Sequence, residues 1–168
     1  MKIRTFLTGF LAVLAGFIGA GSVSAQTTEQ DDTAQTAPQH LSFQGVSIEG
    51  DITDFTSRMQ PRYRMKKRVS GEYCIFEGPV FGYTTYLQAS YSRKSHTVYK
   101  VMVTPKAINQ EAWLDSLQTH YGEPVETDKG LLWTRPEGKI LFYMPQGYDP
   151  VLIYLDEIGV NAFVEEKK

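Results

Sequence analysis

The segment Asn109-Gln110-Glu111-Ala112-Trp113-Leu114-Asp115-Ser116-Leu117-Gln118-Thr119-His120-Tyr121-Gly122-Glu123-Pro124 carries the clearest structural signal in this chain. Asn109 can cap a helix, and Ile108 before it can pack on Trp113. The apolar positions recur at the spacing of one helical face: Trp113, Leu114, Leu117 and Tyr121. Gly122 provides a helix exit and Pro124 prevents continuation. We therefore predict a helix ending at Tyr121, with Trp113 buried against a sheet.

A shorter helix is predicted earlier in the chain, from Asp51 to Met59. Ile52, Phe55 and Met59 would share one face, and Asp51 is a plausible cap. Pro61 stops this helix, because the residue before a proline avoids helical geometry. Short apolar or alternating runs elsewhere predict β-structure, at residues 73–76, 83–91, 98–104, 131–135, 139–144 and 151–156, with a last apolar piece at 160–164.

The predicted order is α-β-β-β followed by α-β-β-β, a repeat of pattern with little residue identity between the halves. Consecutive antiparallel strands with helices segregated to one side form a two-layer arrangement. We predict an α+β fold in which the two α-β-β-β repeats form one antiparallel sheet, with two helices packed on one face.

The N-terminus has the order of a secretory signal peptide. Lys2 and Arg4 precede an apolar run, and small residues follow at the Val23-x-Ala25 spacing. We expect cleavage between Ala25 and Gln26 and a periplasmic or secreted protein. No cysteine follows the apolar run, so we expect no lipid and no stable membrane anchor after cleavage. The predicted organisation is a signal peptide at 1–25, a disordered polar leader at 26–39 and a single domain at 40–168.

Charge and cysteine content narrow the classes of function. Loss of Lys2 and Arg4 with the signal peptide changes the formal net charge from −2 to −4. Mild acidity argues against general nucleic-acid binding, which needs an excess of positive charge. The single cysteine, Cys74, excludes an internal disulfide. Its apolar neighbours favour a buried small side chain, and the alternative is a reactive thiol or an intermolecular disulfide.

Two resemblances agree with this architecture. One part of the chain looks like a module of small uncharacterised exported α+β domains of gut Gram-negative bacteria. It consists of the predicted helix, the Tyr121-Gly122-x-Pro124 turn, the aromatic strand at Leu132-Trp133 and residues 151–155. The segment 40–50 is similar to the opening of such proteins. The helix-plus-meander repeat more distantly resembles the β-lactamase-inhibitor-protein-like architecture, although the cysteines of that inhibitor are absent here. These resemblances imply a fold, and they bring no catalytic or binding residue to this chain.

Catalytic patterns are weak. We predict structural roles for the three histidines. His40 would lie at the edge of the leader, His96 in a hairpin turn and His120 at a helix end. No Gly-x-Ser-x-Gly elbow, paired metal-ligand spacing or phosphate loop occurs, so we expect no metal and no cofactor. Asp156 and Glu157 would point to opposite faces of a strand. Carboxylates from separate strands could still come together as the acid and base of a hydrolase.

A basic segment is the first of two binding features: Arg62-Tyr63-Arg64-Met65-Lys66-Lys67-Arg68. It is either a solvated connection between helix and sheet or an edge that contacts anions. In an extended segment, four of its cations would project to one side: Arg62, Arg64, Lys66 and Arg68. Tyr63 could stack on a sugar or base of the ligand.

The second feature is a polar-aromatic stripe on the strand 83–91. Alternation places Tyr86 on the face opposite Leu87, together with three polar residues: Thr84, Gln88 and Ser90. If that face is uncovered, it would suit recognition of a protein or a carbohydrate by a flat sheet.

These features lead to three functional hypotheses. The first is an exported non-catalytic binding module that holds a protein or an anionic or glycan ligand by its open sheet face or basic edge. The second is a small periplasmic hydrolase that uses carboxylates from separate strands. The third is a structural component of an envelope complex. A deep cleft with clustered carboxylates would favour the enzyme, and a shallow face would favour binding.

Overall fold

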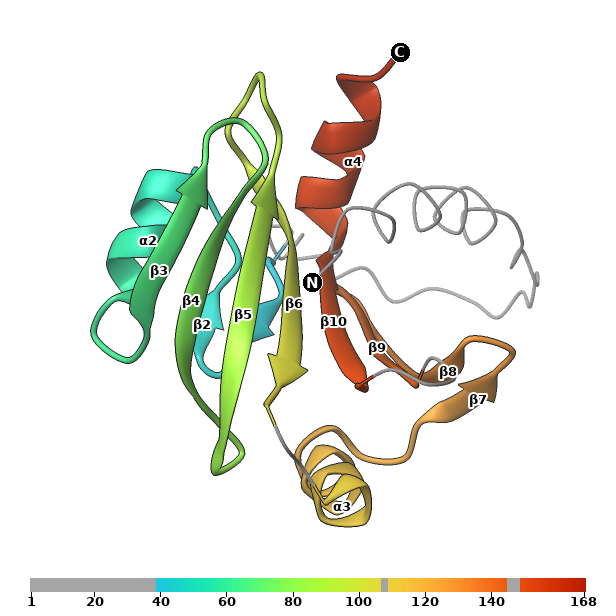
Figure 1. Ribbon diagram of the computed structural model, residues 1–168. Helices are drawn as coiled ribbons and strands as arrows, with labels where there is room; N and C mark the ends of the chain where they lie inside the picture. Colours follow the sequence, from blue (N-terminus) through green and yellow to red (C-terminus); the bar gives the residue numbers. More distant parts are fainter. Residues whose placement is uncertain (1–38, 107–108, 145–148) are drawn as a thin grey trace, which may run out of the picture. The chain divides into compact units, whose positions relative to one another are not determined.

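Eight antiparallel strands form one sheet in the computed structural model, in the order β3-β4-β5-β6-β10-β9-β8-β7 (Figure 1). The structure describes residues 39–106, 109–144 and 149–168, all within the unit Thr36–Lys168. The strands are β3 (Arg64–Val69), β4 (Tyr73–Val80), β5 (Tyr83–Tyr91), β6 (Val98–Pro105), β7 (Val125–Thr127), β8 (Gly130–Arg135), β9 (Gly138–Tyr143) and β10 (Val151–Asp156). A separate small hairpin joins β1 (Ser42–Phe43) to β2 (Val46–Ser47).

Three helices accompany these strands in the described chain, α2 (Ile52–Met59), α3 (Gln110–Tyr121) and α4 (Glu157–Glu165). The prediction of an α+β fold with an antiparallel sheet is confirmed. The finer prediction of two three-strand repeats is incomplete, because β3 and β7 each add an edge strand.

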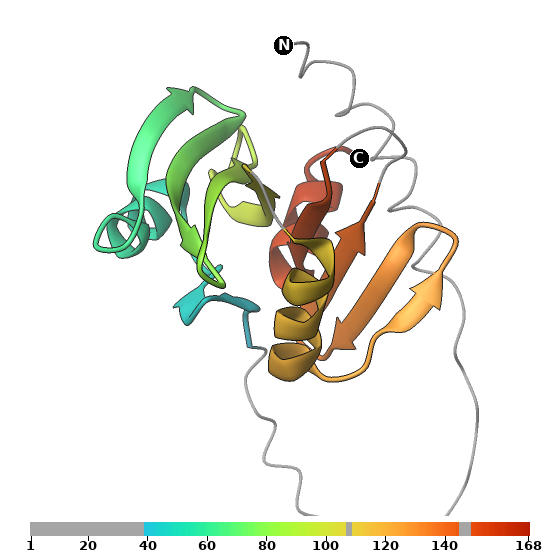
Figure 2. The ribbon, with the colours of Figure 1, turned by 60° about the horizontal axis from the view of Figure 1, so that its bottom comes forward.

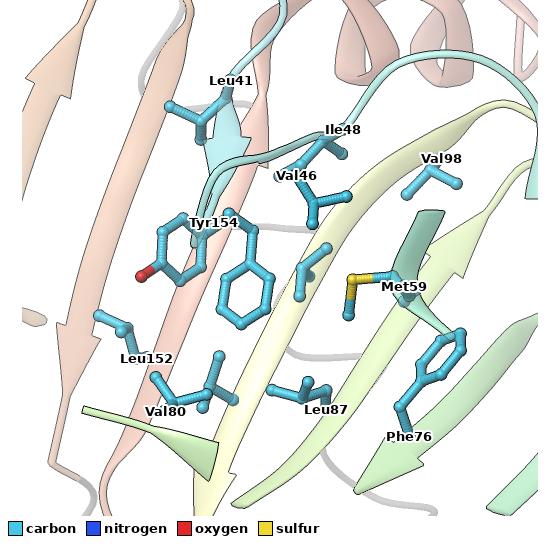
Figure 3. Close-up of a cluster of buried hydrophobic side chains, with 14 of the residues drawn as sticks. Leu41, Val46, Ile48, Met59, Phe76, Val80, Leu87, Val98, Leu152 and Tyr154 are labelled. Carbon is cyan, nitrogen blue, oxygen red and sulfur yellow. The ribbon is translucent and has the colours of Figure 1, made fainter. Parts of the chain in front are cut away.

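The register of the strands separates an inner face of the sheet from an outer one. Residues directly opposite one another in antiparallel strands share a face. Phe76 pairs with Leu87, Leu87 with Val103 and Val103 with Leu152, and all four side chains are buried. These residues lie on the inner face, part of which Figure 3 shows. The hydrophobic core therefore follows the inner face from β4 through β6 to β10.

Helices α2 and α3 both contribute to this core. Phe55 and Met59 of α2 and Trp113 and Leu117 of α3 belong to the same buried cluster as the inner-face side chains. The Trp113 ring meets Phe142 of β9 edge to face, with centroids 5.7 Å apart. Figure 2 brings α3 to the front, with the strands of the second half beside it. Amphipathic spacing was thus a sufficient guide to both helices.

The predicted helix caps are confirmed. Asp51 Oδ1 accepts hydrogen bonds from the backbone N–H groups of Thr53, at 2.6 Å, and Asp54, at 3.0 Å. Asn109 Oδ1 accepts one from Ala112 N–H at 3.3 Å. Each cap satisfies donors that the first helical turn leaves without partners. The predicted packing of Ile108 on Trp113 lies outside the described residues.

The prediction of β-structure for the apolar piece 160–164 is wrong, because these residues belong to α4. Asp156 ends β10 and caps the helix by accepting from Gly159 N–H at 2.8 Å. A Cβ atom on Gly159 would lie 2.3 Å from the carbonyl oxygen of Val98. The helix therefore rests on the backbone of β6, and tertiary contact overrides the β preference of its Val and Phe residues.

Helix α4 packs on the sheet apart from α2 and α3. Its Phe163 stacks on Tyr99 at 4.3 Å between ring centroids. Tyr99 lies beside Ser90, a residue of the outer face. The C-terminal helix therefore covers part of the outer face near the β5–β6 hairpin.

Several predictions concern residues outside this description. The signal peptide at 1–25 and the polar leader up to residue 38 are among them, and both remain predictions. Within the described ranges, no helix has the length and apolar character needed to cross a membrane.

Candidate functional site

A cluster of charges surrounds Glu77 on the outer face of the sheet. Two cations reach its Oε2 atom: Arg64 Nη2 lies at 3.3 Å and Lys66 Nζ at 3.2 Å. Lys106, just beyond β6, donates to Oε1 of the same carboxylate. One carboxylate therefore has three cationic partners, which leaves the cluster with an excess of positive charge.

Strand pairing explains why these residues meet. Glu77 of β4 lies directly opposite Arg64 of β3 and Tyr86 of β5, and Tyr86 lies opposite Thr104 of β6. The four residues form a line across neighbouring strands on one face. Backbone pairing between Lys106 N and Thr84 O extends the ladder beyond β6 and keeps Lys106 beside this line.

The pKa of Glu77 is lowered to about 2, first by the hydrogen bond from Lys106 and then by that from Lys66. The same contact raises the pKa of Lys106. The Glu77 carboxylate and the Lys106 ammonium group are therefore charged at neutral pH. The Glu77 side chain keeps 18% exposure and that of Arg64 keeps 72%, so water and ligands reach the cluster.

Tyr86 lies at the other side of Glu77 and is one of the few large apolar side chains exposed in the described chain, at 39%. The ammonium group of Lys106 lies over its ring, 4.7 Å from the centroid. A cation in this position is attracted to the negative face of the ring. Tyr86 thus holds Lys106 over the sheet, and one face of its ring is occupied.

The predicted row of four cations on one side is wrong, because β3 contains a β-bulge between Met65 and Lys67. A bulge inserts one residue and reverses the alternation of faces beyond it. Lys67 lies opposite Ile75, on the outer face, whereas Arg68 lies opposite Cys74, on the inner side of this edge strand. Both cations are exposed.

The remaining two residues of the predicted basic site also lie elsewhere. Tyr63 is 4% exposed and packs on Phe43, so stacking on a ligand is excluded. Arg62 donates to the backbone oxygen of Gln44 at 2.8 Å, in the turn of the β1–β2 hairpin. The segment turns sharply after α2, where Tyr63 N–H bonds to Met59 O, and this turn removes both residues from the outer face.

The stripe of polar residues on β5 is only partly open. Thr84 and Tyr86 are exposed, but Gln88 and Ser90 are buried, at 8% and 3% exposure. Lys100 lies opposite Ser90 on β6 and is also buried, and this burial lowers its pKa. The accessible surface of the outer face therefore lies at the end that carries Glu77 and Tyr86.

We define the basic face as the accessible group on the outer face that the structure brings together. It comprises Arg64, Lys66, Lys67 and Lys106 with Glu77 and Tyr86. Sequence analysis identified three of the cations and Tyr86, but missed Lys106 and Glu77. The predicted strand 73–76 ended before Glu77, which β4 includes, and only the strand order brings β3 and Lys106 to this carboxylate.

A second polar contact joins the start of the described chain to its end. Asp156 is fully buried and accepts hydrogen bonds from three donors. Its Oδ1 accepts from Leu41 N–H at 2.7 Å, and its Oδ2 accepts from Gly159 N–H at 2.8 Å and lies 2.9 Å from His40 Nδ1. All three bonds link parts of this one chain, so the His–Asp contact is structural. It connects the segment before β1 to the start of α4.

The other residues that the sequence offered as candidates for catalysis are packed against neighbouring side chains. His96 packs on Tyr91 in the β5–β6 hairpin, and His120 packs between Phe81 and Tyr121. Cys74 is fully buried, and burial raises the pKa of its thiol, which opposes formation of the reactive thiolate. Among the residues that the structure describes, no group of three or more His, Cys, Asp or Glu side chains could hold a metal ion.

No family model, no curated protein and no solved structure matches this chain. The resemblances to exported bacterial domains and to the β-lactamase-inhibitor-protein-like architecture therefore remain predictions.

Proposed function

We propose that this protein is an exported, non-catalytic interaction module that binds an anionic partner through the basic face. The observation that carries the proposal is the charge arrangement around Glu77. Three cations share one carboxylate on an accessible sheet surface, while the whole chain has a formal net charge of −2. Concentrated positive charge on an acidic protein attracts anionic surfaces to one place.

The local packing supports a preformed binding surface. Four hydrogen-bonded strands, β3 to β6, position the cations, and their inner sides rest on the hydrophobic core. Glu77 and Tyr86 restrict the motion of Lys106, and Glu77 also restricts Arg64 and Lys66. A preorganised charge loses less conformational entropy when it binds than a freely moving side chain does.

Export is the second part of the proposal, and it is supported by the charge, apolar and small-residue order of residues 1–25. A partner outside the cytoplasm could be an acidic protein or an anionic glycan. Both would meet the basic face through the same negative groups.

The proposal is tested by measuring the binding of two polyanion probes, dextran sulfate and poly-L-glutamate. The protein is purified in the form that the cell yields after processing. The test variant is Arg64→Ser/Lys66→Ser/Lys67→Ser. Each exposed charge contact contributes roughly 0.5 kcal/mol, so loss of three should weaken binding about tenfold. Added salt should weaken the wild-type complex as well, because exposed charges are screened beyond about 8–10 Å at physiological ionic strength.

The matched control is Lys94→Ser/Lys167→Ser/Lys168→Ser, which removes the same net charge from cations outside the basic face. This control should bind both probes within about twofold of the wild type, because net charge alone gives only a weak, unlocalised attraction. Equal weakening in the two triple variants would overturn the proposal, and so would failure of the wild type to bind either probe at low salt.

A further inference from the structure

Strand β3 is an open edge of the sheet. It pairs with β4 on one side only, and it is the terminal strand in the order. Within the described ranges, the backbone of residues 64–68 makes no hydrogen bond outside this pairing. The edge of β3 that faces away from β4 therefore presents N–H and C=O groups to which an added extended chain could form hydrogen bonds.

The bulge gives this edge cations on both faces. Arg64, Lys66 and Lys67 project on the outer side, and Arg68 projects on the side of Cys74. Side chains of an added strand alternate between the two faces in the same way. A chain with acidic residues at successive positions would thus meet a cation on either side, whereas a ligand lying flat on the outer face would not reach Arg68.

The contacts of Glu77 show which negative group these cations accept. Its carboxylate lies against Arg64 and Lys66 at salt-bridge distance, as an Asp or Glu of a partner would. Tyr86, the aromatic residue beside it, already has Lys106 over its ring at 4.7 Å. The site therefore offers fewer contacts to a sugar, which needs an open aromatic face for stacking, than to a peptide, which needs charged and backbone partners.

A second copy of this chain is a poor occupant of the same edge. Pairing of one β3 with another would bring two sets of exposed cations together, and like charges across a strand pair are destabilising. The charges and the bulge thus protect the edge from self-association, as natural edge strands commonly do. They leave it open to an acidic chain.

We propose that the anionic partner is an acidic protein segment that binds in extended conformation along β3, as a further strand of the sheet. This inference rests on the proposed function and adds the partner's chemistry and its binding mode. Carboxylates of the segment contact Arg64, Lys66 and Lys67 on one side and Arg68 on the other, and its backbone bonds to the free side of β3. Charge supplies selectivity, and the backbone bonds supply affinity.

The test compares a short all-glutamate peptide with the same peptide N-methylated at every residue. N-methylation removes the backbone donors and keeps the carboxylates. If the peptide adds as a strand, the N-methylated form should bind at least about tenfold more weakly, because several backbone hydrogen bonds are lost. Amide hydrogen exchange at residues 64–68 should also slow when the unmodified peptide is bound.

Two single variants locate the contact. Arg68→Ser should weaken binding of the peptide about twofold, as expected for one exposed charge contact, and leave dextran sulfate binding unchanged, while the matched control Lys168→Ser should change neither. Equal binding of the two peptides, together with no effect of Arg68→Ser on peptide binding, would overturn the strand-addition inference and leave the proposed function standing. Binding of dextran sulfate without the peptide would also overturn it, in favour of a glycan. Failure of both probes would contradict the proposed function itself.

Discussion

The two faces of β4 and β5 differ sharply over a distance of one residue. On the inner face Phe76 and Leu87 pair and are fully buried, whereas on the outer face their neighbours Glu77 and Tyr86 pair and remain accessible. The inner face of these two strands is mostly apolar, and its side chains form one buried cluster with those of α2 and α3. The outer face is free of that packing requirement, so its residues can carry charge. Fold and candidate binding chemistry are thus separated on the same strands.

The outer face is itself divided. Near α4 it buries Ser90 and Lys100, while at the other end Glu77 and Lys106 are accessible. The C-terminal helix therefore limits where a ligand can lie. The following predictions test the difference between the faces.

The largest effect is expected from Trp113→Ala on the inner side. The Trp113 side chain is fully buried against Phe142, so the free energy of unfolding should fall by about 3–5 kcal/mol. Tyr86→Ala on the outer face is the matched comparison and should cost less than about 1 kcal/mol, because the side chain is partly exposed. Denaturant titrations measure both values. Similar losses in the two variants would contradict the assignment of the faces.

A smaller effect is expected from Gly78→Ala, which adds one methyl group beneath Tyr63. The new Cβ atom would lie 2.5 Å from Tyr63 Cδ1 and 3.1 Å from the Arg62 carbonyl oxygen. Overpacking of this kind costs about 1–3 kcal/mol of unfolding free energy.

The control uses the background variant Tyr63→Ala, in which the closest clashing atom is gone. There Gly78→Ala should cost much less than in the wild type, because the two side chains are coupled. An equal cost in both backgrounds would mean that Tyr63 does not pack against Gly78.

The smallest effect concerns Glu77 and depends on pH. Its pKa of about 2 in the folded protein lies below the ordinary value of 4.5. The ion pairs of Glu77 therefore stabilise the fold fully above pH 4.5, and this contribution disappears as the pH falls from 4.5 towards 2. Glu77→Gln should unfold more easily than the wild type near neutral pH, and the two proteins should converge in acid.

Denaturant titrations of both proteins across this range measure the convergence. A difference between wild type and Glu77→Gln that stays constant from neutral pH down to about pH 2 would show that the carboxylate charge contributes nothing to stability. Asp54→Asn, at an exposed carboxylate on α2, serves as the control outside the cluster.

Local patterns were sufficient for the helices α2 and α3, their caps and the inner face of most strands. Helical spacing and strand alternation depend on near neighbours in the chain, so Phe55, Trp113 and Leu87 could be assigned to the core before any long-range contact was known. The same reasoning identified Tyr86 and the basic segment. It failed at 160–164, where α4 forms because Asp156 caps it and Gly159 admits the backbone of β6.

Only the tertiary structure decided how the basic residues are divided and what they contact. The bulge in β3 turns Arg68 away from Arg64, a change that no regular alternation predicts. Strand order brings Lys106 to Glu77, although the two residues lie 29 positions apart in the sequence. The fold also brings His40 to Asp156, which lies 116 positions away. The physical reason is that apolar periodicity reports which side of an element is buried. Contacts between charges depend instead on which elements become neighbours when the core forms.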